Sequence, residues 1–180
     1  KLYHHGEPIT LSAVLPVLEH MGVQVVDERP YAIYPEKTEP CWIHDFGLAH
    51  DPALELDAGQ LREHFQSAFA AIWRGEADDD GFNRLILMAG LSWRDIVILR
   101  AYAQYLRQAG TTYSQPYIED SLSANPEIAA GLVTLFEARL HPERANAETA
   151  TQCTQTIETQ LDAVASLDED RILRRLLAAI

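Results

Sequence analysis

The residues best suited to metal chemistry are histidines near the start of the chain. His4, His5, His44 and Asp45 lie in two segments that read as β-strands, and a zinc site needs three or four such ligands in a fixed geometry. Because His4 and His5 are consecutive, their side chains point to opposite faces of a strand, and only one of them can join His44. We therefore interpret these residues as histidines of a sheet and predict no metal site.

A second set of possible ligands is the acidic segment from Glu76 to Gly81, with the sequence EADDDG. If Glu76 is the first position of a calcium loop, Gly81 falls correctly at the sixth position. The twelfth position, which should be a bidentate glutamate, is then Leu87. The closing ligand is missing, so we interpret the three aspartates as residues that favour the start of a helix.

Nucleophilic catalysis would need a cysteine beside a histidine base. Cys41 and His44 are three residues apart on a predicted strand, which places them on opposite faces. The chain has no H-E-x-x-H, paired C-x-x-C, G-x-S-x-G, G-x-G-x-x-G or P-loop motif. We predict no catalytic residue, no cofactor-binding residue and no metal ligand in this sequence. Cys41 and Cys153 are far apart and favour a reduced, cytoplasmic setting over a disulfide.

Four charged residues, Arg94, Asp95, Arg100 and Arg107, fall on a predicted helix that is otherwise apolar. Charges in such a helix are usually paired with neighbouring helices, so we expect structural ion pairs. The alternative is an interface with another domain.

The composition excludes several classes of function. The chain of 180 residues has a net charge of −13 and is 47% hydrophobic. An acidic chain is repelled by nucleic acid and by anionic membranes. No apolar run approaches the roughly 20 residues that span a bilayer. These values are typical of a globular protein that buries a core.

The pattern changes near residue 52, which divides the chain into a mixed part, 1–52, and a helical part, 53–180. The first part reads as strand 1–5, a helix from about 10 to 21, strand 23–33 and strand 41–48. In the second strand, Val23, Val25, Tyr31 and Ile33 are expected to face inward, with a bulge or kink at 27–30. In the third strand, Trp42, His44 and Phe46 should share one face.

We predict an α+β fold that is predominantly α. A β-α-β-β run is most of a ferredoxin-like unit, which needs one more helix and strand. After it we expect a multi-helix bundle. Asp57 should cap its first helix, Ser92 and Asp95 should form a capping box, and Asp168 should cap its last helix. The helix from Trp93 to Ala109 carries four consecutive apolar residues at 96–99, which predicts a central helix that is apolar on all sides.

Several stretches together resemble the large NAD-specific glutamate dehydrogenases of bacteria, in the region just before their catalytic domain. The matching residues are Val14–Gly22 with Val25–Tyr31, Trp42–Gly47, Ala68–Trp73, Asn83–Leu85, Trp93–Asp95, Arg100–Tyr102 and Tyr113–Gln115. The resemblance covers nearly the whole chain, and rare Trp and Tyr residues match in order.

This resemblance implies that 1–52 is a partial ACT-like module and that 53–180 is a helical domain or connector leading to an absent catalytic domain. The parent enzyme would oxidise L-glutamate to 2-oxoglutarate and ammonia and reduce NAD. Its catalytic lysines and dinucleotide-binding loop have no matching position in residues 1–180, so no catalytic residue is carried over. The resemblance also implies a homo-oligomer in which this chain contacts the remainder of the parent.

Both ends of the sequence lie inside predicted elements, so we expect an excised piece of a longer polypeptide. The leading hypothesis is a non-catalytic structural and regulatory segment of such a dehydrogenase. One alternative is a free-standing module that binds an amino acid. The sequence lacks the Gly-rich strand-to-helix turn that usually marks such sites in ACT-like modules, but Gly6-Glu-Pro8 lies at the corresponding place. Another is a module that docks a partner protein through the helix at 147–164.

Overall fold

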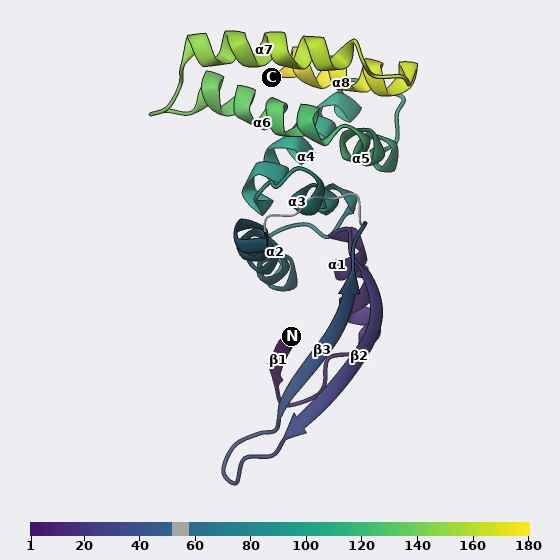
Figure 1. Cartoon of the computed structure of the whole chain (residues 1–180), viewed down its shortest axis with the longest axis vertical. Coiled ribbons are helices and arrows are strands. Elements are labelled where there is room, and N and C mark those ends of the chain that lie inside the picture. The colour runs from purple at the N-terminus through teal and green to yellow at the C-terminus, as the bar shows by residue number, and fades with distance from the viewer. Residues whose placement is uncertain (52–57) are drawn as a thin grey trace.

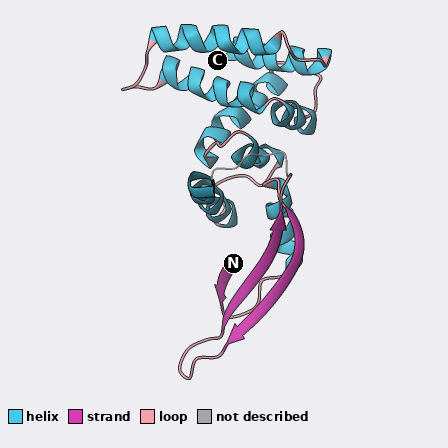
Figure 2. Cartoon of the chain, in the orientation of Figure 1, coloured by secondary structure: helices cyan, strands magenta, loops and turns pink. Residues whose placement is uncertain are grey.

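The computed structural model describes residues 1–51 and 58–180. A small sheet with one helix forms one end of the molecule, and the other helices stack away from it toward the opposite end (Figure 1). Figure 2 shows the same division by type, with all the strands gathered at one end. The predicted α+β class, with helix predominating, is confirmed.

The sheet is an antiparallel unit of three strands in the order β1-β3-β2. The chain runs through β1 (Leu2–His5), α1 (Leu11–His20), β2 (Gln24–Ile33) and β3 (Cys41–Ala49). The connection through α1 leaves a gap between β1 and β2, and β3 fills it as the second strand of a hairpin. This is the predicted β-α-β-β part of a ferredoxin-like unit.

A bulge in β2 overturns part of the predicted strand pattern. The register with β3 shifts between Val25 and Asp27, so one extra residue reverses the alternation of side chains. Val23 before the bulge is buried as predicted. Tyr31 and Ile33 after it are 51% and 49% exposed. The prediction that Tyr31 and Ile33 face inward was therefore wrong.

The helix α1 covers one face of the sheet and connects it to the rest of the molecule. Gly22 ends the turn after α1 with φ +86°, a conformation that favours glycine. A buried apolar cluster combines Val14 and Leu18 of α1 with Val23 beside β2 and Leu87 from the helical part. The two parts of the fold therefore share this cluster.

The helical part begins at α2 (Ala58–Trp73). A 3₁₀ helix follows at Gly81–Arg84, and the remaining helices are α3 (Leu85–Met88), α4 (Trp93–Gln108), α5 (Gln115–Ala124), α6 (Pro126–Leu140), α7 (Ala147–Leu161) and α8 (Leu167–Ala179). The predicted boundary between residues 52 and 53 and the predicted cap Asp57 lie outside the described residues. None of the described helices is long and apolar enough to cross a membrane.

N-cap side chains form hydrogen bonds at the start of several described helices. Ser92 and Asp95 form the predicted capping box, in which each side chain accepts from the other residue's backbone N–H. The predicted cap at Asp168 was wrong. Ser166 occupies that position, and its hydroxyl accepts from the N–H of Glu169. Asp168 lies in the first turn instead, where its charge still favours the helix dipole.

The helix α4 is central, since it packs against α2, α3, α5, α6 and α8. It is not apolar on all sides, as the sequence had suggested. Ile96, Leu99 and Ala103 are buried, whereas Val97 is 43% exposed. Four consecutive apolar residues cover a full helical turn, so at least one of them must point away from the core.

The helices α6 and α7 form an antiparallel pair with a very close approach. A Cβ atom added to Gly131 of α6 would lie 3.0 Å from Cγ1 of Ile157 on α7. Ile157 is fully buried, so it has little room to move. Gly131 therefore sets the spacing of the two helices.

We predict that Gly131→Ala destabilises the chain by about 1 kcal/mol. Overpacking against Ile157 should cost about 2 kcal/mol, and the higher helix propensity of alanine should offset about 1 kcal/mol of that cost. Urea denaturation measures this change. In an Ile157→Ala background, which removes both Cγ1 and Cδ1, the cost should be smaller. Equal costs in the two backgrounds would contradict this packing account.

Candidate functional site

A buried ion pair joins the loop after α2 to the central helix. Arg100 of α4 is 5% exposed. Its Nε donates to Oδ2 of Asp80 at 2.7 Å, and its Nη2 donates to Oδ1 of the same carboxylate at 2.8 Å. Nη2 also donates to Oδ1 of Asn83 at 3.2 Å. Two parallel bonds of this kind are a strong and directional form of ion pair.

The ion pair continues into a network that reaches α5. Nε2 of Gln115 donates to Oε1 of Glu119 at 2.9 Å and lies 3.5 Å from Oδ2 of Asp80. Glu119 is 5% exposed. At the edge of the network, Nη1 of Arg84 donates to Oδ1 of Asp120 at 2.8 Å. These polar groups hold the 3₁₀ helix, α4 and α5 together.

The network explains the acidic segment that resembled a calcium loop. Oδ1 of Asp80 accepts from the N–H of Phe82 and caps the 3₁₀ helix, and both of its oxygens bind Arg100. The interpretation of these acids as helix-start residues is confirmed for Asp80. Over residues 1–51 and 58–180, no group of three or more His, Cys, Asp and Glu residues could hold a metal ion.

Among contacts within the part of the chain that the structure describes, the predicted structural ion pair is confirmed for Arg100 and not for the other three charged residues of α4. The guanidinium of Arg94 lies 4.3 Å from the ring centroid of its neighbour Trp93. Asp95 serves the capping box. Arg107 donates to Oε1 of Gln115 at 3.3 Å. Sequence reasoning missed Asn83, Gln115 and Glu119 as members of the network, because no local pattern marks them.

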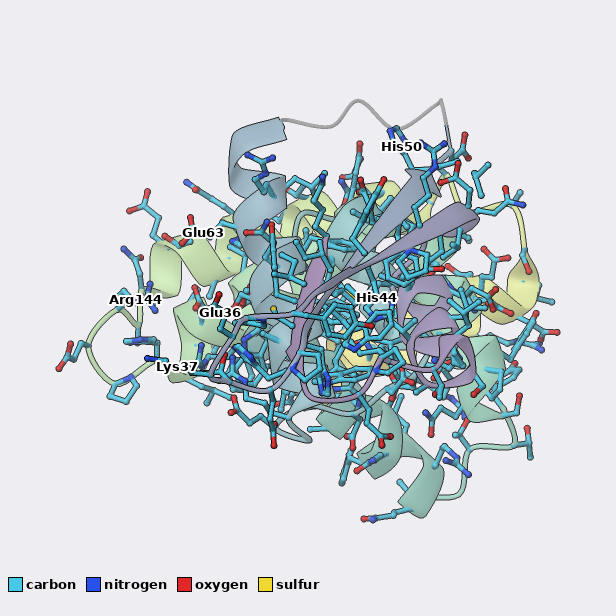
Figure 3. The ribbon with its side chains drawn as sticks, turned by 90° about the horizontal axis from the view of Figure 1, so that it is seen from below. Glu36, Lys37, His44, His50, Glu63 and Arg144 are labelled. Carbon is cyan, nitrogen blue, oxygen red and sulfur yellow. The ribbon has the colours of Figure 1, made fainter. Side chains whose placement is uncertain are left out.

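The histidine His44 lies buried in the sheet module (Figure 3). Its Nε2 is 3.1 Å from the backbone N of Ile9 and must accept that N–H. Its Nδ1 therefore carries the proton and donates to Oε1 of Glu28 at 2.8 Å. Trp42 and Phe46 stack on either side, each 6.3 Å away between ring centroids. The three side chains therefore lie in a row on one face of β3, as predicted.

The candidate metal residues have separate roles in the sheet. His4 donates from Nδ1 to the carbonyl of Glu7 at 2.8 Å, and His5 is exposed. Asp45 pairs with Lys1 at 3.1 Å. Both ring nitrogens of His44 form hydrogen bonds, with Ile9 and Glu28, so neither nitrogen is available as a base for the thiol of Cys41. The structure does not bring these residues together.

The corner between β1 and α1 is held from β3. Nε1 of Trp42 donates to the carbonyl of Gly6 at 3.1 Å, and the N–H of Gly6 donates to the carbonyl of Pro40 at 2.8 Å. Gly6 has φ +85°, which favours glycine. Together with the bond from Ile9 to His44, these contacts fix the backbone of the Gly6-Glu-Pro8 turn.

An apolar cavity of about 570 Å³ lies between the sheet, α1 and α2. Leu18, Phe46, Leu61, Phe65, Phe69 and Leu87 line its apolar part. Sequence reasoning did not predict this cavity, because its walls come from elements far apart in the chain. Its volume falls within the roughly 300–1,000 Å³ of small-molecule sites.

Comparisons with known proteins give a family likeness for two parts of this fold. A family model described as the ACT3 domain of glutamate dehydrogenase matches residues 1–61. A second model, described as helical motif 3 of glutamate dehydrogenase, matches residues 77–142. The sheet module is therefore similar to an ACT domain, and the helices that carry the Arg100 network are similar to a helical motif of glutamate dehydrogenases.

Curated relatives named NAD-specific glutamate dehydrogenase cover more of the chain than either model. The protein of Halomonas elongata is 46% identical over 181 residues, and that of Pseudomonas aeruginosa is 44% identical over 185 residues, in each case across the whole chain. The protein of Mycobacterium tuberculosis is 41% identical over 94% of the chain. The chain spans 11% of the length of each relative. The predicted resemblance to a segment of the NAD-specific glutamate dehydrogenases is confirmed.

We predict that Asp80→Asn destabilises the chain by about 3 kcal/mol, because it removes the counter-charge of the buried Arg100 and leaves the exposed carboxylate of Asp78, 3.7 Å from Nε of Arg100. Urea denaturation measures the free energy of unfolding. Arg144→Gln is the matched control, since Arg144 lies on an exposed loop (Figure 3) and pairs with Glu137 at 3.4 Å. That exposed pair should contribute about 0.5 kcal/mol or less. Similar losses in the two variants would contradict the role given to Asp80.

The thiol of Cys153 should react slowly in the folded chain. Burial raises its pKa, and its Sγ donates to the carbonyl of Gly131 at 3.1 Å. The thiolate is the reactive form, so its fraction at pH 8 falls when the pKa rises. Mass spectrometry after iodoacetamide treatment should show slower modification of Cys153 in the folded chain than in urea. Equal rates in the two states would contradict this prediction.

Proposed function

We propose that the chain is a non-catalytic structural and regulatory segment of an NAD-dependent glutamate dehydrogenase. The observation that carries the proposal is the match across the whole chain to one stretch of relatives with that name. The parent would convert L-glutamate, NAD and water into 2-oxoglutarate, ammonia and NADH. The NAD site and the catalytic groups would belong to other parts of the parent, and the segment would act in the cytoplasm.

The contacts of the polar residues support a structural role. Asp80 and Arg100 bind each other through both carboxylate oxygens, and both nitrogens of His44 are committed to Glu28 and Ile9. A group that acts in catalysis must exchange protons or bonds with a substrate. These groups instead hold neighbouring elements in position, which is the role that a supporting segment needs.

The regulatory part of the proposal is centred on the ACT-like module and the remainder of the parent chain. A homo-oligomer would place several such modules close together. A small effector, such as an amino acid, is a candidate ligand at the Gly6-Glu-Pro8 turn. The specific support is that Trp42 and His44 hold this turn from β3, so its backbone is fixed before any ligand arrives. An amino-acid-binding module is therefore the second candidate function.

The isolated chain should produce no NADH from L-glutamate and NAD. The assay follows NADH absorbance, with the complete Pseudomonas aeruginosa dehydrogenase as the positive control. Glutamate-dependent NADH formation that copurifies with the isolated chain would overturn the non-catalytic role.

The second candidate function has a separate test. Titration calorimetry with a panel of amino acids should give saturable heat for a ligand of the Gly6 turn. Trp42→Phe removes the indole N–H that holds Gly6 and should weaken that binding. A panel without saturable heat would reject the amino-acid-binding module and leave the structural role intact.

A further inference from the structure

We propose that the cavity between the sheet and α2 is a binding site for an amphipathic carboxylate, such as a medium-chain fatty acid. The inference does not depend on the proposed dehydrogenase role, because it is drawn from the chemistry of the cavity wall. No ligand site has been assigned to these residues by the comparisons or by the sequence motifs.

The body of the cavity suits an apolar chain. Phe46 of β3 and Phe65 and Phe69 of α2 face it together with leucines from α1, α2 and α3. Burial of each methylene group of a ligand against such a wall contributes about 0.8 kcal/mol. The ligand must therefore carry a hydrocarbon portion.

Among the described residues, the polar part of the wall carries basic or neutral side chains. The polar residues that line the cavity within the described chain are Lys1, His50, Arg62 and Gln66. The sequence has 27 acidic residues against 14 lysines and arginines, so the lack of an acid among the lining residues of 1–51 and 58–180 runs against the overall composition. This local charge favours an anion.

Arg62 is the residue best placed to bind the anionic group. It is exposed on the first part of α2, and within the described residues it has no ion-pair partner. Lys1 differs, because the carboxylate of Asp45 at 3.1 Å offsets the charge of its ammonium group, and the hydrogen bond between them raises the pKa of Lys1. His50 lies at the end of β3 (Figure 3), and its Nδ1 donates to the carbonyl of Asp51 at 2.8 Å. A guanidinium matches a carboxylate through two parallel bonds.

The same wall disfavours a free amino acid. An α-ammonium group needs an acceptor such as a carboxylate, and no acidic side chain lines the cavity within residues 1–51 and 58–180. A fatty or 2-oxo carboxylate lacks that ammonium group. The cavity and the Gly6 turn are therefore expected to prefer different ligands.

The test uses the chain as it is and three probes with the same tail: octanoate, octanol and α-aminooctanoate. Methyl NMR follows Leu18, Leu61 and Leu87 in the cavity, with Leu132 and Leu173 of the helical core as references. Octanoate should shift the cavity methyls saturably and leave the references unchanged. Octanol lacks the charge-assisted bonds to Arg62, and the ammonium group of α-aminooctanoate has no acidic acceptor among the described lining residues, so each should bind about tenfold more weakly than octanoate.

Two variants separate the charge from the cavity. Arg62→Gln should weaken octanoate about tenfold while octanol binding is unchanged. Arg94→Gln, on an arginine away from the cavity, is the control and should bind octanoate normally. Ala70→Phe should fill the cavity and abolish binding of all three probes. If Ala70→Phe does not fold, the comparison of Arg62→Gln with Arg94→Gln still decides the question.

Three results would overturn the proposal. The first is the absence of saturable shifts at Leu18, Leu61 and Leu87 with octanoate. The second is equal affinity for octanoate and octanol. The third is octanoate binding by Arg62→Gln at the affinity of the unchanged chain.

Discussion

The buried pair of Arg100 and Asp80 is the interaction on which the helical part depends. A guanidinium can leave water only if a carboxylate and further acceptors replace its hydration. Asp80 supplies two bonds and Asn83 a third, and this requirement fixes the loop after α2 against α4. Gln115 extends the constraint to α5. These bonds therefore constrain how the loop after α2, α4 and α5 pack together.

A second polar contact has the same role in the sheet module. His44 accepts from Ile9 and donates to Glu28, so one side chain of β3 joins the start of α1 to β2. Trp42 holds Gly6 from the same face of the strand. The two parts of the fold then meet through the apolar cluster around Leu18 and Leu87. They leave a cavity between them, because α2 is held by the helical part and the strands by their own ladder.

Features set by neighbouring residues could be predicted from the sequence, and those set by distant ones could not. The Ser92–Asp95 capping box is read from two residues within one turn, and it was predicted correctly. Arg100 was expected to be paired, because a charge in an apolar helix needs a partner. Its partner Asp80 lies 20 residues away, and no periodicity points to it.

The wrong predictions also arise where residues outside the local sequence pattern decide the structure. Tyr31 and Ile33 point outward because a bulge near Val26 reverses the alternation, and the sequence places the kink only approximately, at 27–30. Ser166 caps α8 in place of Asp168 because either residue type can cap, and the choice depends on where the preceding chain turns. The cavity is bounded by α1, β3 and α2 together, so only the assembled fold reveals it.

The central claim is that this segment supports a dehydrogenase and does not take part in its chemistry. The most direct measurement is steady-state kinetics and thermal unfolding of the complete Pseudomonas aeruginosa enzyme with this chain in place of the stretch that it matches, compared with and without Asp80→Asn. The account predicts a lower unfolding temperature and an unchanged kcat and KM for glutamate and NAD, each per folded enzyme. A changed kcat or KM at an unchanged unfolding temperature would contradict it.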